Sequence, residues 1–293
     1  MKLVSYASPR GARAGVLTPE GVIDVWDATG AEYSTDQSGR LHAAPGGLRA
    51  ALEILTPSAI ATAVEDASPA ETQGQVQLLP PITDPQKIIC FGLNYHAHAA
   101  EAGIEPPEVP TFFAKFANAL AAPGETVTLP TASDKIDYEA EVAFVIGQRT
   151  KDVPEDQALD RIAGYTLLND LSARDLQFAT PQWIPGKVFD GSGPCGPWLV
   201  TPDEAGDPAA IEFALELNGQ RMQEGSTADL IFAIPKLLAH LSTLMTLEPG
   251  DLISTGTPAG VGSTRDPKIW LADGDEILVS SPTLGELRTT IAR

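Results

Sequence analysis

The sequence predicts a β-rich α+β fold with a small N-terminal α/β domain, and two observations lead to this prediction. Beyond residue 86 the chain is a series of short segments rich in β-branched residues and bounded by glycine and proline, as strands are. Few helical segments interrupt them, whereas a doubly wound parallel sheet alternates strands with helices. With 293 residues, the chain can bury a sizeable core.

The N-terminal part is expected to be a separate small domain, in which three strand-like segments precede one helical candidate. These segments lie at 2–7, 13–18, 21–28 and, for the helix, 46–55. Residues 63–87 contain a double proline and many polar residues, which indicates a linker or a wrapping strand. We therefore expect a boundary near residue 75, with the small domain and linker at 1–75 and a larger domain at 76–293.

The larger domain is predicted to consist mostly of strands. Its clearest helical candidate is 228–245, where Pro235 should either kink the helix or lie in its first turn. The expected strands lie at 87–93, 125–130, 139–147, 163–170, 197–201, 211–219, 251–256 and 275–282.

Composition excludes one class of function. The formal net charge is -20, and only 19 lysines and arginines are spread along the chain, so nucleic acid is not an expected partner. An acidic protein also repels anions at long range, so any anion site must be locally basic.

The sequence also indicates the cellular compartment of the protein. Cys90 and Cys195 lack metal-ligand spacing and are interpreted as small, semi-apolar residues in a reducing compartment. The apolar run before Arg10 is too short for a signal peptide, and no stretch reaches about 18 uncharged apolar residues. We expect a cytoplasmic protein without a membrane partner.

The stretch at 137–147, DYEAEVAFVIG, places two acids directly before an apolar segment. Side chains two apart in an extended chain point to the same face, so Glu139 and Glu141 should converge. The residues that follow are apolar on both faces, which indicates a buried strand with the acids at its mouth. Buried carboxylates must be protonated, paired with cations or bound to metal. The alternative is a solvated strand edge.

A third acid, Asp170, ends the apolar segment at 163–170. Mg²⁺ favours carboxylate oxygens and needs more than two ligands, so Glu139, Glu141 and Asp170 together are a candidate metal site. All three stand at ends of apolar strands, where loops build sites on a rigid scaffold.

The polar turn after Asp170 is expected to open a helix, in which Arg174 and Gln177 are neighbours because they are three residues apart. A guanidinium beside a metal is suited to hold a carboxylate at two points. Alternatively, Arg174 pairs with Asp175 or Asp170 and holds the turn. Asp175 itself is interpreted as structural.

The segment at 92–103, GLNYHAHAAEAG, carries two of the four histidines. On a short helix His98 and Glu101 share a face, and such a pair can act as a general base oriented by a carboxylate. The alternative is an ordinary surface contact. Gly92 and Gly103 flank the segment and would let it move as a lid.

Three further features are weaker. Lys187, in PGKVFD, is placed to present an ammonium to an anion, although most lysines of this kind are simply exposed. Lys115 is similar, or is a core-edge residue with a buried stem. The glycine-rich loop at 254–262 lacks the lysine of a P-loop, so phosphate binding is rejected, but Thr257 can offer a hydroxyl to a carboxylate.

Together these segments resemble the fumarylacetoacetate hydrolase family. The resemblance covers about 85–293, and residues 1–75 resemble the small variable N-terminal domain of longer members. It consists of six segments in the family's order: GLNYHAHAAEAG, TFFAKFANALAAPGE, DYEAEVAFVIG, AGYTLLNDLSARDLQ, QWIPGKVFDGSGPCGPWLV and DLISTGTPAGVG.

The resemblance implies a mixed β-sandwich roll, usually a homodimer, with one Mg²⁺ or Mn²⁺ per subunit. Glu139, Glu141 and Asp170 fall on the family's metal ligands, and His98 and Glu101 on a His–Glu pair carried by a lid. The groups that line the family's substrate pocket are matched by Lys187, Arg174, Gln177 and Thr257.

One segment departs from the family pattern. The family has an acid, a small residue, Phe and Ala before P-x-GPW, whereas this chain has DGSGPCGPW. This loop has small residues, namely Gly191, Ser192 and Gly193. The departure does not concern the metal or the base, and it leaves the pocket width and the type of substrate open.

The predicted function is a divalent-metal hydrolase that cleaves the C–C bond of an acylpyruvate-type β-diketo acid. His98, oriented by Glu101, would be the base, and Lys187 and Gln177 would steady the oxyanion. A decarboxylase or isomerase of oxaloacetate- or hydroxymuconate-type keto diacids on the same site is the alternative. A metal-binding module without turnover is a third interpretation, against which the His–Glu pair argues.

Overall fold

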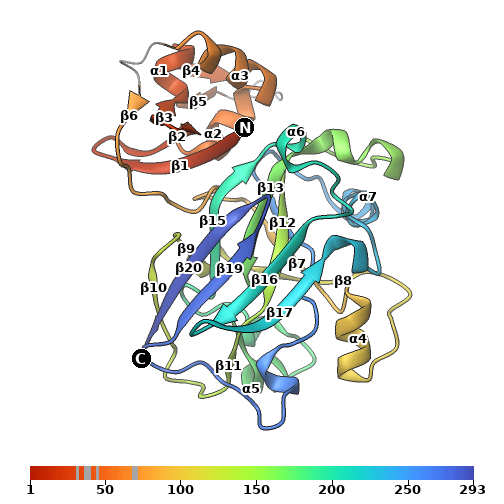
Figure 1. Cartoon of the computed structure of the whole chain (residues 1–293). Coiled ribbons are helices and arrows are strands. Elements are labelled where there is room, and N and C mark those ends of the chain that lie inside the picture. The colour runs from red at the N-terminus through yellow and green to blue at the C-terminus, as the bar shows by residue number, and fades with distance from the viewer. Residues whose placement is uncertain (31–32, 36–40, 44–45, 68–71) are drawn as a thin grey trace.

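The computed structural model describes residues 1–30, 33–35, 41–43, 46–67 and 72–293. Two mixed sheets form the body, and the described helices are short (Figure 1). Across the larger sheet the strands run β6 (Thr72–Gln73), β3 (Gly21–Asp24), β2 (Gly11–Thr18), β1 (Lys2–Ser8), β15 (Gly193–Val200), β13 (Ile162–Asn169), β12 (Ala140–Ile146), β18 (Leu252–Ser254), β7 (Ile88–Gly92) and β8 (Thr111–Lys115), with β9 (Leu120–Ala121) beside β15.

The second sheet packs on β12, β13 and β15 of the larger sheet, and apolar side chains of both sheets form one core. Its strands run β10 (Thr126–Thr128), β20 (Gly285–Ala292), β19 (Glu276–Ser281), β16 (Glu212–Leu217) and β17 (Gln220–Ser226). Two strand pairs complete the described strands: β11 (Ile136–Asp137) with β14 (Ser172–Ala173), and β4 (Tyr33–Thr35) with β5 (Leu41–Ala43). The predicted β-rich α+β fold of two packed sheets is confirmed.

The described α-helices have between 4 and 11 residues. They are α1 (Val25–Thr29), α2 (Leu48–Ile54), α3 (Pro57–Glu65), α4 (His96–Ala102), α5 (Arg174–Gln177), α6 (Pro202–Ala205) and α7 (Ile234–Leu244). In the described part of the chain, no helix has both the length and the apolar character needed to cross a bilayer.

Two predicted elements need correction. The helix expected at 228–245 is shorter, because α7 begins at Ile234 with Pro235 in its first turn, where a missing N–H costs no helical hydrogen bond. Of the two alternatives for Pro235, the first-turn position is confirmed and the kink is wrong. Likewise, the segment at 21–28 is a strand only to Asp24, whose carboxylate accepts from the Asp27 N–H and starts α1.

Part of the N-terminal region joins the larger sheet directly. Strand β1 pairs with β15, with Lys2 opposite Val200 (Figure 1). Residues 77–79 run along β1, since Leu79 N–H donates to the Ser5 carbonyl at 2.9 Å and Leu78 forms an isolated bridge with Tyr6. The sheet thus continues across residue 75, and the domain boundary there stays a prediction.

Strands β12 and β13 position the acids. Both are buried along their whole length, as apolar character on both faces predicts. They are antiparallel, with Ala140 opposite Asn169 and Glu141 opposite Leu168. The start of one strand therefore lies beside the end of the other, next to Asp170.

Candidate active site

The three predicted metal ligands converge. Ligand oxygens of Glu139, Glu141 and Asp170 all lie within 4.8 Å of one another, and all three residues are buried. The β12–β13 register explains this cluster, because it brings Glu141 in β12, and Glu139 directly before it, to the end of β13. Since all three are buried, the alternative of a solvated strand edge is wrong.

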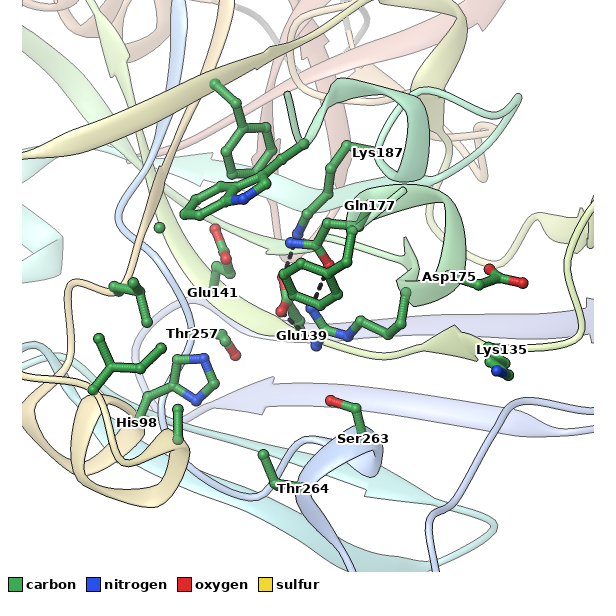
Figure 2. Close-up of a pocket in the computed structure, with 18 of the residues that line it drawn as sticks. His98, Lys135, Glu139, Glu141, Asp175, Gln177, Lys187, Thr257, Ser263 and Thr264 are labelled. Atoms are coloured by element: carbon green, nitrogen blue, oxygen red, sulfur yellow. Dashed lines mark hydrogen bonds and ion pairs between the residues drawn. The ribbon is translucent and has the colours of Figure 1, made fainter. Parts of the chain in front are cut away.

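Two buried lysines neutralise part of this cluster. Lys187 Nζ lies 2.6 Å from Glu139 Oε2 (Figure 2). It also lies 2.7 Å from Asp170 Oδ2. Lys115 Nζ lies 2.7 Å from Asp170 Oδ1 and also donates to the Lys187 carbonyl. Neither lysine is a simply exposed side chain, and Lys115 is more than the core-edge residue that sequence reasoning allowed.

Arg174 contacts two acids, Asp137 and Glu139, that neither sequence alternative named as its partners. Its Nε donates to Asp137 Oδ2 at 2.9 Å, and Nη2 lies 2.6 Å from Glu139 Oε1. Its Nη1 donates to Gln177 Oε1 at 3.0 Å, which confirms that these two side chains are neighbours on α5. Pairing of Arg174 with Asp175 or Asp170 is therefore wrong. As predicted, Asp175 has a structural contact, accepting from the Ser133 hydroxyl.

Sequence reasoning missed Asp137. This carboxylate is fully buried and accepts from the backbone N–H groups of Gly262 and Ser263, at 2.7 and 3.0 Å. A signal was present, because Asp137, Glu139 and Glu141 alternate along one extended segment and alternation predicts a shared face.

The buried charges of this centre almost balance. Four acids face three bases, which leaves one negative charge in excess when all are ionised; they are Asp137, Glu139, Glu141 and Asp170 against Lys115, Arg174 and Lys187. Burial, together with Asp170 and Glu139, raises the pKa of Glu141 well above its usual value. Burial acts the same way on Glu139, but Arg174 and Lys187 outweigh it and lower the pKa of Glu139.

A hard divalent cation fits this donor set. The three converging ligands are carboxylates, which suit Mg²⁺ and Mn²⁺. A doubly charged ion would turn the single excess negative charge into a positive one. The centre would then favour one substrate carboxylate, which is the local basicity that an acidic chain needs for an anion site.

His98 and Glu101 form a contact on α4, as predicted. His98 Nδ1 lies 3.4 Å from Glu101 Oε2, and Glu101 Oε1 accepts from the Gly260 N–H at 3.0 Å. The Glu101 carboxylate is thereby held by the glycine-rich loop, and the pair is only partly exposed. In Figure 2 the imidazole of His98 faces the cavity below Glu141 and Thr257.

A cavity of about 550 Å³ joins the imidazole to the acid cluster. Thr257 lines it, but its hydroxyl already donates to the Ala140 carbonyl at 2.9 Å and accepts from Gln223 Nε2 at 2.8 Å. The predicted site residues that line this cavity are His98, Glu139, Glu141, Arg174, Gln177, Lys187 and Thr257. Asp170 and Glu101 do not line the cavity. Asp170 contacts Lys187, and Glu101 contacts His98.

The family model for the C-terminal domain of fumarylacetoacetate (FAA) hydrolase matches residues 87–292. The chain belongs to this family. Its match spans all the site residues described above, whereas residues 1–86 lie outside it.

Three relatives illustrate the family. The Xenopus laevis mitochondrial oxaloacetate tautomerase fahd2 is 40% identical over 222 residues, which are 75% of this chain and 70% of that protein. The fumarylacetoacetate hydrolase of Exiguobacterium antarcticum is 32% identical, with a TM-score of 0.82 and full coverage of both chains. The maleylpyruvate hydrolase of Sphingobium sp. SYK-6 is 31% identical, with a TM-score of 0.79 over 100% of this chain and 99% of that one.

The loop at 191–193, which departs from the family pattern, contacts Lys187 and Lys115. Ser192 Oγ donates to the Lys187 carbonyl at 2.8 Å, and a Cβ atom added to Gly193 would lie 3.2 Å from Lys115 Cε. Among the described residues that line the cavity, none belongs to 191–193. Gly193 therefore leaves room for Lys115, and an effect of this loop on pocket width stays a prediction.

Proposed function

We propose that this family member is a divalent-metal-dependent hydrolase that cleaves a C–C bond in an acylpyruvate-type β-diketo acid. The observation that carries the proposal is the shared cavity, which has a His–Glu pair on one side and the acid cluster on the other. Such a site can hold a keto acid and remove a proton from water in the same space. Two of the relatives described above are hydrolases by name, which supports this choice.

The chain's residues have distinct roles in the proposed reaction. His98 takes a proton from water, whose oxygen attacks the acyl carbonyl, and Glu101 holds the imidazole in orientation. The bond between the acyl carbon and the pyruvyl carbon breaks, and its electron pair stays on the pyruvate enolate. The enolate then takes a proton, so the products are a carboxylic acid and pyruvate.

A cation held by Glu139, Glu141 and Asp170 would stabilise the enolate charge as a Lewis acid. Lys187 and Gln177 lie beside this cluster and can donate hydrogen bonds to an oxyanion. Arg174 has less freedom, because its three nitrogen atoms already face Asp137, Glu139 and Gln177. We therefore assign it mainly to holding Glu139.

The second candidate is a decarboxylase or isomerase of keto diacids on the same site. It is favoured by the oxaloacetate tautomerase among the relatives. His98 would then move a proton at carbon instead of activating water. The difference lies in whether water reaches the acyl carbonyl.

A product assay tests the proposal. The purified chain is incubated with an acylpyruvate and with oxaloacetate, in Mn²⁺ or Mg²⁺ and again with chelator. Pyruvate plus a carboxylic acid, formed only with the cation, is the expected result. Carbon dioxide release, or enol–keto conversion without fragments, would establish the second candidate instead.

We also propose that the protein is a cytoplasmic homodimer. Light scattering would test whether it is a dimer.

A further inference from the structure

Ala140 separates the two glutamates of the acid cluster, and its backbone polar groups point away from β13. The Glu139 carbonyl accepts from the Asp170 N–H at 2.9 Å, on the β13 side. The Val142 carbonyl accepts from the Thr255 N–H, directly after β18, at 3.0 Å. Since backbone groups alternate between the two sides of a strand, the N–H and carbonyl of Ala140 lie on the β18 side.

The backbone of Ala140 is bonded on this side by two side chains. The register of β12 with β18 runs from Ala143 to Val145, so Ala140 lies beyond its end. Gln223 Oε1 accepts from the Ala140 N–H at 2.9 Å, and the Thr257 hydroxyl donates to the Ala140 carbonyl at 2.9 Å. Ala140 is fully buried, where an unpaired N–H or carbonyl would be costly.

A third hydrogen bond closes a ring around Ala140. Gln223 Nε2 donates to Thr257 Oγ1 at 2.8 Å, and also to the Pro258 carbonyl at 3.0 Å. These partners fix the orientation of the Gln223 amide, because a backbone N–H only donates and a carbonyl only accepts. Both N–H groups of the amide are used, so the side chain is held at three points.

Gln223 brings this support from the other sheet. It lies in β17, the last strand of the second sheet, 83 residues from Ala140 (Figure 1). Its backbone is placed by pairing with Leu215 of β16, and its side chain is buried. The backbone between the two glutamates is therefore attached to a strand that belongs to neither β12 nor its neighbours in the larger sheet.

The same amide also supports the loop that holds Glu101. Gln223 donates to the Pro258 carbonyl, and two residues later the Gly260 N–H donates to Glu101 Oε1 at 3.0 Å. A Cβ atom added to Gly260 would lie 2.2 Å from the Met222 carbonyl oxygen, so this loop lies directly on β17. The acid cluster and the His–Glu pair thus share one support.

We propose that Gln223 is a positioning residue that fixes Glu139 and Glu141 for a divalent cation, through the ring it shares with Thr257. This inference rests on the metal site of the proposed function. Gln223 is not one of the three converging acids and does not line the cavity. It acts through Ala140, because a backbone held in advance leaves less freedom to be lost when the ion binds.

The test measures the Kd for Mn²⁺ by calorimetry, on metal-free protein and without substrate. Gln223→Met keeps the length of the side chain but removes its three hydrogen bonds, so the Kd should rise about tenfold, the scale of lost support for metal ligands. Gln220→Met makes the same substitution at an exposed position of β17 and should leave the Kd unchanged. Val279→Ala destabilises the same sheet from its apolar side and should also leave it unchanged.

Thr257→Val opens the ring without changing Gln223, and it decides the question if Gln223→Met does not fold. Its Kd for Mn²⁺ should also rise about tenfold. In the double variant Gln223→Met/Thr257→Val the Kd should rise by clearly less than the product of the two single effects, because either substitution opens the same ring. Circular dichroism checks that each variant is folded.

The outcomes separate this inference from the proposed function. A wild-type Kd in folded Gln223→Met or in Thr257→Val, an equal rise in Val279→Ala, or a full product of effects in the double variant would overturn the positioning ring and leave the metal site standing. Failure of the wild type to bind Mn²⁺ would overturn the metal site of the proposed function, and the positioning role with it.

Discussion

Arg174 is fixed by Asp137, since its Nε atom donates to Oδ2 of that fully buried carboxylate at 2.9 Å. Asp137 is held in turn by the Gly262 and Ser263 N–H groups. The guanidinium that contacts Glu139 is therefore tied to the loop that borders the cavity. The orientation of Glu139 therefore depends on Asp137, which does not line the cavity and is not one of the three converging acids.

Removing the Asp137 charge should destabilise the fold. In Asp137→Asn the new amide would face the N–H donors of Arg174 and Ser263, and Arg174 would lose a buried counter-ion. We expect the free energy of unfolding in urea to fall by about 3 to 5 kcal/mol, as when one member of a buried ion pair is removed. Asp175→Asn, at an exposed acid of α5, is the matched control and should change it little. Equal stability of the two variants would contradict this role for Asp137.

The acid cluster should bind Mn²⁺ through Glu141. Glu141→Gln removes one charge and one anionic ligand from the three that converge, so the Kd for Mn²⁺ in calorimetry should rise at least about 100-fold. Asp175→Asn again serves as control, because Asp175 lines the cavity outside this cluster. Wild-type affinity in Glu141→Gln would show that the cation binds elsewhere.

His98 should be needed for turnover and His96 should not. The two histidines lie on α4, but His98 lines the cavity and contacts Glu101, whereas His96 is exposed. His98→Ala should lower kcat at least about 100-fold, the scale of a general base, while His96→Ala stays near wild type. Circular dichroism checks that both variants fold. A folded His98→Ala enzyme with normal kcat would remove His98 from the mechanism.

A buried network in the N-terminal region should make stability depend on pH. Burial by itself raises the pKa of Asp24, but hydrogen bonds from Arg13 and Tyr6 outweigh it and hold the pKa below its ordinary value. A lowered folded pKa stabilises above the unfolded pKa of about 3.9, and this contribution is lost as pH falls through the folded value.

The comparison of wild type with Asp24→Asn isolates that contribution. At pH 7 the variant should unfold in urea with a free energy lower by about 3 kcal/mol or more, because Arg13 keeps its buried charge without this partner. The difference should shrink below about pH 4. Asp27→Asn removes a partly exposed partner of Arg13 and should cost less at every pH. A difference that does not change with pH would count against the role of the Asp24 charge.

Local patterns in the sequence were sufficient for the residues that are close in the chain. Alternation predicted that Glu139 and Glu141 share a face, and helical spacing predicted the contacts of His98 with Glu101 and of Arg174 with Gln177. These geometries follow from the two-residue repeat of strands and the turn of a helix.

Other predictions were less accurate where sequence periodicity is weak. Strand β17, QRMQEGS, was not predicted, because its polar residues lack apolar alternation and its pairing with β16 supplies the order. The helix at 228–245 was placed too early, since Pro235 fits either a kink or a first turn and only the start of α7 at Ile234 distinguishes them.

The sequence by itself determined the β-rich class and the residue types of the centre, because strand alternation and carboxylate chemistry are local properties. Only the tertiary structure decided which base meets which acid. Lys115 lies 55 residues from Asp170, and Arg174 lies 37 residues from Asp137. Such pairs depend on how strands align, and a register shift of one residue would turn every side chain of a strand to the opposite face.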